Sequence, residues 1–132
     1  NGWQSALIPA IYKQEFEGIN EFYKDIKTIL VIHDLDEYSA AKKSDIIDVG
    51  VNVPSKLKGN SLNIYDISSY SADAILIIDS PGDKISSKLL KKTAFKDNKK
   101  KVTIFEQKID ENIDYNSVTK ALDQIISKLT SK

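Results

Sequence analysis

The sequence predicts an α/β fold: three layers, with a mostly parallel sheet of four to five strands and helices on both faces. Two observations support this. Runs that are apolar at nearly every position occur at residues 28–32 and 72–79, as expected of strands buried on both faces. Stretches with apolar residues every three or four positions lie between and around them, which is typical of helices. Alternating strands and helices of this kind predict a parallel sheet.

The helical stretches are predicted from this spacing and from capping signals. Residues 5–26 are interpreted as one broken helix or two short ones, and residues 37–47 and 116–129 as further helices. After residue 79, Ser80 as N-cap, Pro81 in the first position and Asp83 two residues on predict the start of another helix. We expect one domain over residues 1–132, with residues 1–26 forming an N-terminal helical segment that packs on the sheet.

Three further strands are predicted from β-branched or alternating apolar residues. They lie at residues 49–53, 61–66 and 102–105. Residues 49–53 end before Pro54, which disfavours continuation of a strand.

Composition excludes several classes of site. The chain has 132 residues, with 19 basic residues (all of them Lys) balanced by 19 acidic ones. A dedicated nucleic-acid binder would show a basic surplus, so no nucleic-acid partner is expected. There is no Cys and one His, His33, which excludes disulfides, thiol catalysis and any site with several His ligands.

The sequence also bears on where the protein acts. Its longest apolar runs are much shorter than the ~20 residues of a membrane-spanning helix, so no transmembrane segment is expected. The chain begins with Asn1 rather than Met, which favours a processed form or an excised domain. The absence of Cys and Met fits an extracytoplasmic domain, although the composition of an AT-rich genome gives the same pattern.

Acidic residues end or follow three of the predicted strands, one of them being Asp66 at the end of residues 61–66. Asp34 and Asp36 come after residues 28–32, and Asp79 ends residues 72–79. Ligands of open α/β sheets bind beyond the carboxyl ends of the strands, and carboxylates there are suitable ligands for Mg²⁺. The alternative is that each Asp caps the helix after its strand, which is the more frequent role of Asp at this position.

Two short resemblances bear on these acids. Residues 29–34 and 75–82 resemble the first and third strands of a response-regulator receiver domain, which implies Mg²⁺ binding after the first strand and phosphorylation at Asp79. Asp34-Leu35-Asp36 together with residues 79–83 is similar to the first and last acidic motifs of haloacid-dehalogenase-type phosphatases. Each resemblance covers only a few residues.

Three other side chains are candidates for a role. His33 could act as a base oriented by Asp34, or it could be structural. Trp3 and Tyr12 belong to an aromatic-rich N-terminal segment, and either would be a suitable interface anchor if exposed.

From these observations we expect a non-catalytic α/β interaction domain rather than an enzyme. It would need no cofactor and would bind a protein partner as a subunit or module of a larger assembly, for example in a bacterial cell envelope. The alternative is a Mg²⁺-dependent, receiver-like phosphoacceptor or phosphotransfer domain that uses Asp34, Asp36 and Asp79.

Overall fold

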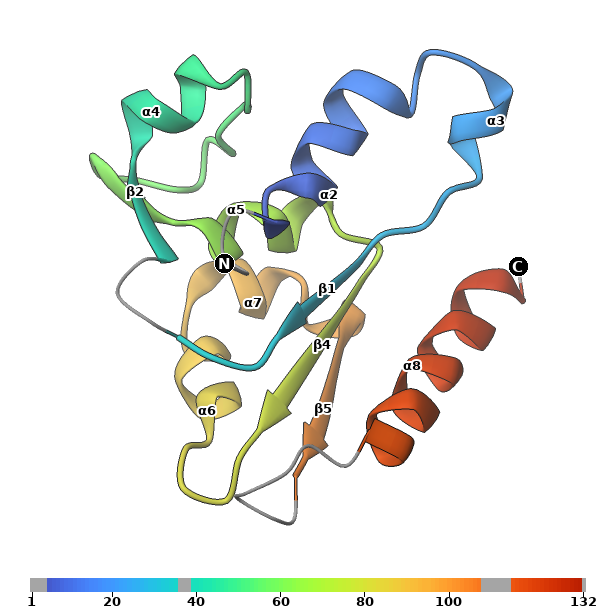
Figure 1. Cartoon of the computed structure of the whole chain (residues 1–132). Coiled ribbons are helices and arrows are strands. Elements are labelled where there is room, and N and C mark those ends of the chain that lie inside the picture. The colour runs from blue at the N-terminus through green and yellow to red at the C-terminus, as the bar shows by residue number, and fades with distance from the viewer. Residues whose placement is uncertain (1–4, 36–38, 108–114, 132) are drawn as a thin grey trace.

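The computed structural model describes residues 5–35, 39–107 and 115–131. Its central element is a parallel sheet in the order β1-β4-β5, formed by β1 (Ile29–Ile32), β4 (Ala74–Asp79) and β5 (Val102–Glu106) (Figure 1). Leu30 of β1 is aligned with Ile75 of β4, which is the strand in the middle. All six residues of β4 are buried, because this strand has a neighbour on each edge and helices over each face.

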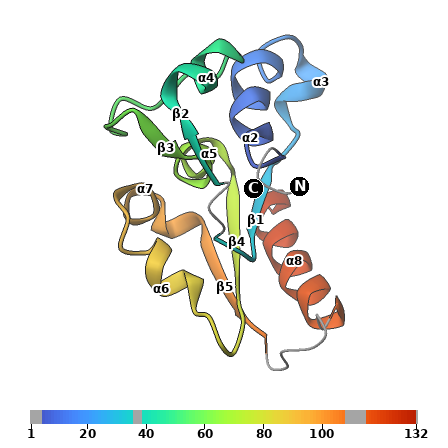
Figure 2. The same cartoon turned by 60° about the vertical axis from the view of Figure 1, so that its left-hand side comes forward.

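Helices cover both faces of this sheet, so the predicted three-layer α/β fold is confirmed. One face packs against α5 (Ile64–Ser71), α6 (Ile85–Leu89) and α7 (Thr93–Asp97). The other packs against α8 (Tyr115–Thr130). Figure 2 shows α6 and α7 on one side of the strands and α8 on the other.

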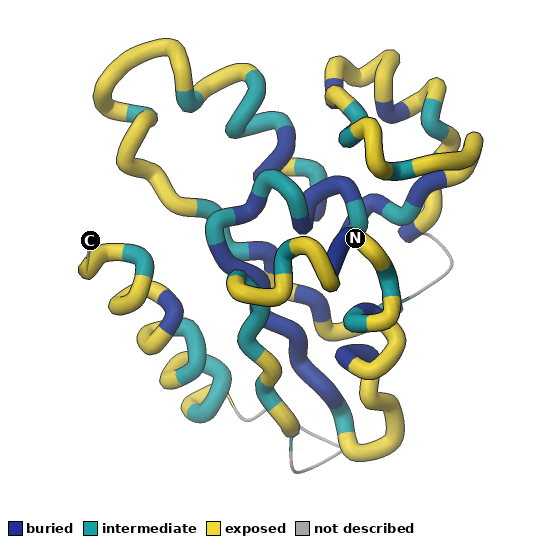
Figure 3. Tube along the Cα trace, turned by 180° about the vertical axis from the view of Figure 1, so that it is seen from behind, coloured by how far each residue is buried: buried dark blue, intermediate teal, exposed yellow. Residues whose placement is uncertain are grey.

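The alternation of side chains along each strand produces these two cores. Leu30, Ile32, Ile75 and Ile77 enter the larger core, together with Phe95 of α7. The intervening residues of β4 contact α8, whose Ile125 is 2% exposed. Seen from behind, the buried part of the chain follows the central strands, whereas α8 alternates between exposed and partly buried stretches (Figure 3).

A second, smaller sheet lies between β1 and β4 in the chain. It is antiparallel and joins β2 (Ala40–Lys42) to β3 (Ser61–Asn63), with the short helix α4 (Lys43–Asp48) directly after β2. The parallel sheet within the described residues therefore has three strands rather than the four to five predicted.

Three local predictions in this region are wrong. Residues 40–42 form a strand where a helix over 37–47 was predicted, and the helix begins only at Lys43. Residues 49–53 form no strand, because Gly50 turns the chain with a φ of 87°. The strand predicted over 61–66 ends at Asn63, whose side chain accepts a hydrogen bond from the Tyr65 amide and starts α5.

The N-terminal segment is divided as its sequence predicts. It contains α2 (Ile8–Ile11), a π-helical turn η1 (Tyr12–Phe16) and α3 (Glu21–Lys24). Ala6, just before α2, lies in the larger core with Leu30. A single 3₁₀ turn, η3 (Lys99–Lys101), precedes β5. No helix within the described residues is long and apolar enough to cross a membrane.

Candidate active site

The carboxyl ends of the three parallel strands form one edge of the sheet. Ile32 is level with Ile77, and Asp79 is level with Glu106, so the residues after β1 and the last residues of β4 and β5 lie in a row. Open α/β sheets bind ligands at this edge. The edge carries the sequence-predicted Asp34 and Asp79, and His33 lies on it as well.

His33 and Asp34 follow β1 directly and are both exposed. The Asp34 carboxylate accepts a hydrogen bond of 2.7 Å from the backbone amide of Leu35, which fixes the direction of the chain as it leaves the strand. The imidazole of His33 can donate and accept hydrogen bonds at its two nitrogens. This pair is therefore open to a ligand at the edge. Asp36 lies outside the described residues.

Asp79 differs from Asp34 in that it is buried, with 2% of its surface exposed. Its Oδ1 accepts a hydrogen bond of 2.8 Å from the Ser86 amide, and its Oδ2 accepts one of 2.5 Å from the Ser86 hydroxyl. Both oxygens are thus directed at the first turn of α6, where unpaired amides favour a carboxylate. The helix-capping role considered for Asp79 is the one its contacts show.

This contact corrects the predicted start of the helix after β4. The expected N-cap, Ser80, instead closes a tight turn with Asp83, in which each backbone amide donates to the other residue's carbonyl at 3.2 Å. The helix begins at Ile85. The capping carboxylate stands seven residues before the amide that donates to it. No short-range motif marks such a contact, and for that reason the sequence did not indicate Ser86.

Exposed ion pairs surround the same edge. Lys88 contacts Asp83 at 2.7 Å, and Lys84 contacts Glu106 at 3.3 Å, linking the loop after β4 to the end of β5. The side chains of both pairs are at least half exposed, so each pair adds little to stability. They place charged and hydrogen-bonding groups beside the carboxyl edge of the sheet.

The predicted metal site is brought together only in part. Asp34 and Asp79 lie on the same edge, but no group of three or more His, Asp or Glu side chains in the described part of the chain has the arrangement of a metal site. Since Asp36 lies outside that part, the Mg²⁺ site stays a prediction.

Of the two predicted interface anchors, Tyr12 lies within the described residues. Tyr12 is half-buried, donates its hydroxyl hydrogen bond to the carbonyl of Tyr23, and stacks on Phe16 with ring centroids 6.5 Å apart. Burial, and then the charge of Glu17, raises the pKa of the Tyr12 phenol. Trp3 lies outside the described residues.

The opposite, amino edge of the sheet holds strands together. The carboxylate of Asp73, just before β4, accepts hydrogen bonds from the amide and hydroxyl of Thr28, just before β1, at 2.8 and 3.1 Å. Lys13 of η1 adds an ion pair to Asp73 at 3.4 Å. These contacts connect the N-terminal segment to both strands.

Comparison with known proteins finds matches to the part of the chain that contains β1 and β4. The family described as "Starch synthase catalytic domain" matches residues 1–81, which run through α2, β1 and β4 to the turn after β4. A glycogen synthase of Lachnospira eligens is 30% identical over 79 residues. That match covers 60% of this chain but only 16% of the Lachnospira enzyme. No solved structure matches.

These matches overturn the expected function. The expectation of a non-catalytic interaction domain, and with it the receiver-like alternative, is wrong, because the matching family consists of catalytic domains. The expectation that the chain is not part of an enzyme is wrong for the same reason. Nothing in the comparisons supports the cell-envelope assembly.

The sequence resemblances considered at first involved a few residues around each acid, whereas the family match extends over more than half of the chain. It includes both strands whose carboxyl ends carry His33, Asp34 and Asp79. The chain belongs to the starch synthase catalytic domain family.

Proposed function

We propose that this chain forms part of a glycosyltransferase that adds sugar units to a glucan of the glycogen or starch type. The observation that carries the proposal is the family match over residues 1–81. The named relative is a glycogen synthase. Because the match to it covers 16% of that enzyme, we expect the activity to need further segments that complete the site.

The carboxyl edge of the sheet is the part of this chain proposed to face the substrate. His33 and Asp34 are exposed there, directly after β1, which pairs with β4. An imidazole can exchange hydrogen bonds with sugar hydroxyls through both nitrogens, and a carboxylate can accept from them. Asp79 supports this arrangement, because the hydrogen bonds that it accepts from Ser86 fix the loop that follows β4.

A hybrid enzyme tests the proposal. The 79 matched residues of the Lachnospira eligens glycogen synthase would be replaced by the aligned residues of this chain. The assay would measure transfer of labelled glucose to glycogen from the donor that the parent enzyme uses. We expect the hybrid to retain transfer above the level of an enzyme-free reaction.

Two variants of the hybrid make the test specific. His33→Ala should lower the rate by about 10²-fold if the imidazole contributes to proton transfer or orientation. Lys58→Ala, at an exposed position of the β2–β3 connection, should leave the rate unchanged. A folded hybrid without transfer would refute the proposed function, and equal rates for His33→Ala and the unsubstituted hybrid would refute the role of His33.

A further inference from the structure

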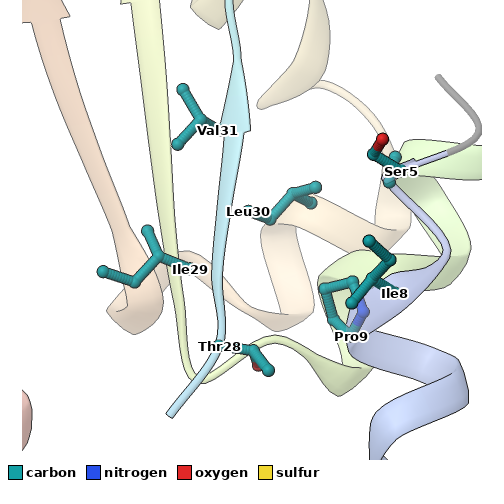
Figure 4. Close-up of a pocket in the computed structure, with 8 residues that line it drawn as sticks. Ser5, Ile8, Pro9, Thr28, Ile29, Leu30 and Val31 are labelled. Carbon is teal, nitrogen blue, oxygen red and sulfur yellow. The ribbon is translucent and has the colours of Figure 1, made fainter. Parts of the chain in front are cut away.

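Two hollows of different character are lined by the two residues of the Thr28–Asp73 contact at the amino edge of the sheet. Thr28 lines the first, which has a volume of about 370 Å³ and separates β1 from α2. Figure 4 shows Leu30 on β1 pointing across this hollow toward Pro9 on α2. All of the residues that line it are uncharged, so it has no group to compensate the charge of an ionic ligand.

The hollow lined by Asp73 is charged. It has a volume of about 400 Å³ and is bordered by Lys13 of η1, the end of α5, Asp73 and Lys101. A smaller hollow of about 140 Å³ shares Asp73 and Lys101 with it and continues past the start of β5 to α8. We call these two hollows together the amino-edge groove. It lies at the opposite ends of the strands from His33 and Asp34.

Lysines outnumber acids among the residues that line the amino-edge groove. They come from three separate elements: Lys13 from η1, Lys100 and Lys101 from η3, and Lys128 from α8. The acid is Asp73, which already accepts two hydrogen bonds from Thr28 and pairs with Lys13. Lys13 also pairs with Glu17 at 2.5 Å. The charge of Lys13 is therefore compensated within the chain.

The other three lysines of the groove are not compensated in this way. Within the described residues, no carboxylate lies at ion-pair distance from Lys100, Lys101 or Lys128. The excess of positive charge in the groove is local, since the net charge of the whole chain is zero. A concave surface lined by charges of one sign concentrates ions of the other sign.

Lys101 is the least exposed of these three lysines. Its Nζ donates to the carbonyls of Tyr70 at 3.1 Å and Ser69 at 3.5 Å. Both carbonyls belong to the last turn of α5, and the end of a helix carries only about half of a negative elementary charge. Burial lowers the pKa of the Lys101 ammonium, because the group has lost water without gaining a carboxylate.

The contacts of Lys101 with α5 do not account for the rest of the groove. Lys100 and Lys128 line the smaller hollow from η3 and α8, and Thr103 of β5 lines it as well. The apolar side chains of Ile125 and Leu129 complete its wall, which lowers the local dielectric and strengthens interactions between charges. The groove thus combines several cations with a hydroxyl donor in a partly apolar hollow.

A phosphate group matches this set of donors. It carries about 1.5 to 2 negative charges at pH 7 and has three strong acceptor oxygens directed to different sides. It can therefore accept from ammonium groups that belong to different elements, whereas a carboxylate presents two oxygens in one plane. Lysine binds phosphate as a compact charge, and every basic residue of this chain is a lysine.

We propose that the amino-edge groove binds a phosphate group, either as inorganic phosphate or as the phosphoryl group of a small organic phosphate. Lys101 and Lys128 donate to its oxygens from η3 and α8, and Lys100 adds charge at the rim. These three lysines lie outside residues 1–81, which match the starch synthase family. The inference is therefore independent of the proposed function.

Titration of the isotope-labelled 132-residue chain with inorganic phosphate, followed by amide NMR shifts, tests the inference. We expect the amides of Lys101, Thr103 and Lys128 to shift and to reach saturation. Sodium chloride at the same ionic strength should not reproduce these shifts, since it only screens charges. Shifts that do not saturate, or that chloride reproduces, overturn the inference.

A parallel titration with glycerol 2-phosphate distinguishes the two sources of the phosphate group. Tighter binding of glycerol 2-phosphate than of inorganic phosphate supports an organic phosphate as the ligand. Tighter binding of inorganic phosphate supports the free ion. Saturable shifts at Lys101 and Lys128 with neither compound overturn the inference.

Two variants, each with a matched control on the same element, locate the site. Lys101→Gln should weaken phosphate binding about tenfold, because it removes a charge-assisted hydrogen bond. Lys128→Gln, at an exposed position of α8, should weaken it about threefold. Lys99→Gln on η3 and Lys120→Gln on α8 remove the same charge, but these residues line neither hollow. Both controls should bind phosphate like the wild type.

Urea unfolding checks that all four variants are folded, and Lys128→Gln keeps the test decisive if the loss of the α5 contacts destabilises Lys101→Gln. Equal weakening in Lys128→Gln and Lys120→Gln overturns the inference, because it would mean that phosphate responds to overall charge rather than to the groove. None of these outcomes affects the transfer assay of the hybrid enzyme.

Discussion

Asp79 and Ser86 are joined by two hydrogen bonds, one from the backbone amide of Ser86 and one from its hydroxyl, at 2.8 and 2.5 Å. The pair connects the end of the central strand to the first turn of α6. It fixes the loop that borders the candidate active site, although neither residue is exposed there.

Removal of the Asp79 carboxylate should therefore destabilise the fold. In Asp79→Ala the buried Ser86 amide and hydroxyl lose their acceptors, which costs about 1–3 kcal/mol in the free energy of unfolding. Urea unfolding followed by circular dichroism measures this. Asp83→Ala is the control, because its partner Lys88 is exposed and the change should be within about 0.5 kcal/mol. Equal losses in the two variants would contradict the capping role.

The contacts of Asp73 with Thr28 and Lys13 at the amino edge should make the free energy of unfolding depend on pH. Burial alone would raise the pKa of the Asp73 carboxyl, but hydrogen bonds from Thr28 and the charge of Lys13 bring that pKa below its ordinary value. Asp73 thus stabilises the folded chain above the unfolded-state pKa of about 3.9. That contribution is lost as pH falls through the lower, folded-state pKa.

The measurement is urea unfolding of wild type and Asp73→Asn at several pH values. We expect the wild type to be more stable near neutral pH and the difference to shrink below about pH 4. A difference independent of pH would show that the ionised form of the Asp73 carboxyl is not what stabilises the folded chain.

Replacement of Lys92 should also have an effect that depends on pH, because its partner Asp66 is an acid with a raised pKa. Burial raises the pKa of the Asp66 carboxyl, and Lys92, 3.3 Å away, offsets this only in part. Lys92→Met leaves the Asp66 carboxylate without its partner and should destabilise the chain at neutral pH. Protonation of Asp66 relieves that cost, so stability relative to wild type should recover as the solution is acidified.

Thermal unfolding between neutral pH and pH 4 checks the Lys92 prediction. Lys91→Met, at an exposed neighbouring position, is the control and should match the wild type at each pH. A loss in Lys92→Met that stays constant down to the lowest pH would mean that packing of the lysine stem, rather than its charge, accounts for the effect.

Two glycines provide a test of backbone conformation. Gly50 has a φ of 87°, whereas Gly18 has an ordinary backbone conformation, and neither position has an atom within 4 Å of an added Cβ. Gly50→Ala should cost about 1 kcal/mol through backbone strain. Gly18→Ala should be neutral or slightly stabilising, since it restricts the unfolded chain. Chemical unfolding of both variants measures the difference, and similar values would contradict the strain argument.

The sequence predicted those parts of the fold that depend on burial. β4 and β1 were identified because a strand covered on both faces must be apolar at nearly every position. The helix α8 was identified because one apolar stripe packs on the sheet. In these segments the local pattern and the tertiary contacts require the same residues.

Elements that depend on a distant contact were not predicted. Residues 61–66 alternate like a strand, but Asn63 caps a helix whose Ile64 and Ile67 are buried in different cores. Ser80 has the sequence features of an N-cap, but Asp79 is placed better because it ends a strand directly beneath α6. Asp34 and Asp79 were predicted together as acids at strand ends. Packing decides that Asp34 is exposed and Asp79 is buried.

The family was not predicted from the sequence; its match extends over residues 1–81, and the named relative is 30% identical over 79 residues. The resemblances to other families involved acids at strand ends. Such acids occur in many α/β proteins for the physical reason that they cap the next helix, so they indicate the edge where a ligand binds but not its chemistry.

The order of strands in the sheet also has a consequence for folding. β4 pairs with β5 after a connection made only of α6, α7 and η3, whereas Thr28 and Asp73, at the start of β1 and β4, are 45 positions apart in the chain. Closing a longer loop costs more chain entropy, and non-local contacts form late. We therefore expect β4, α6, α7 and β5 to assemble first and β1 to join last. The more apolar of the two edge strands would then also be the last to be buried against its neighbours.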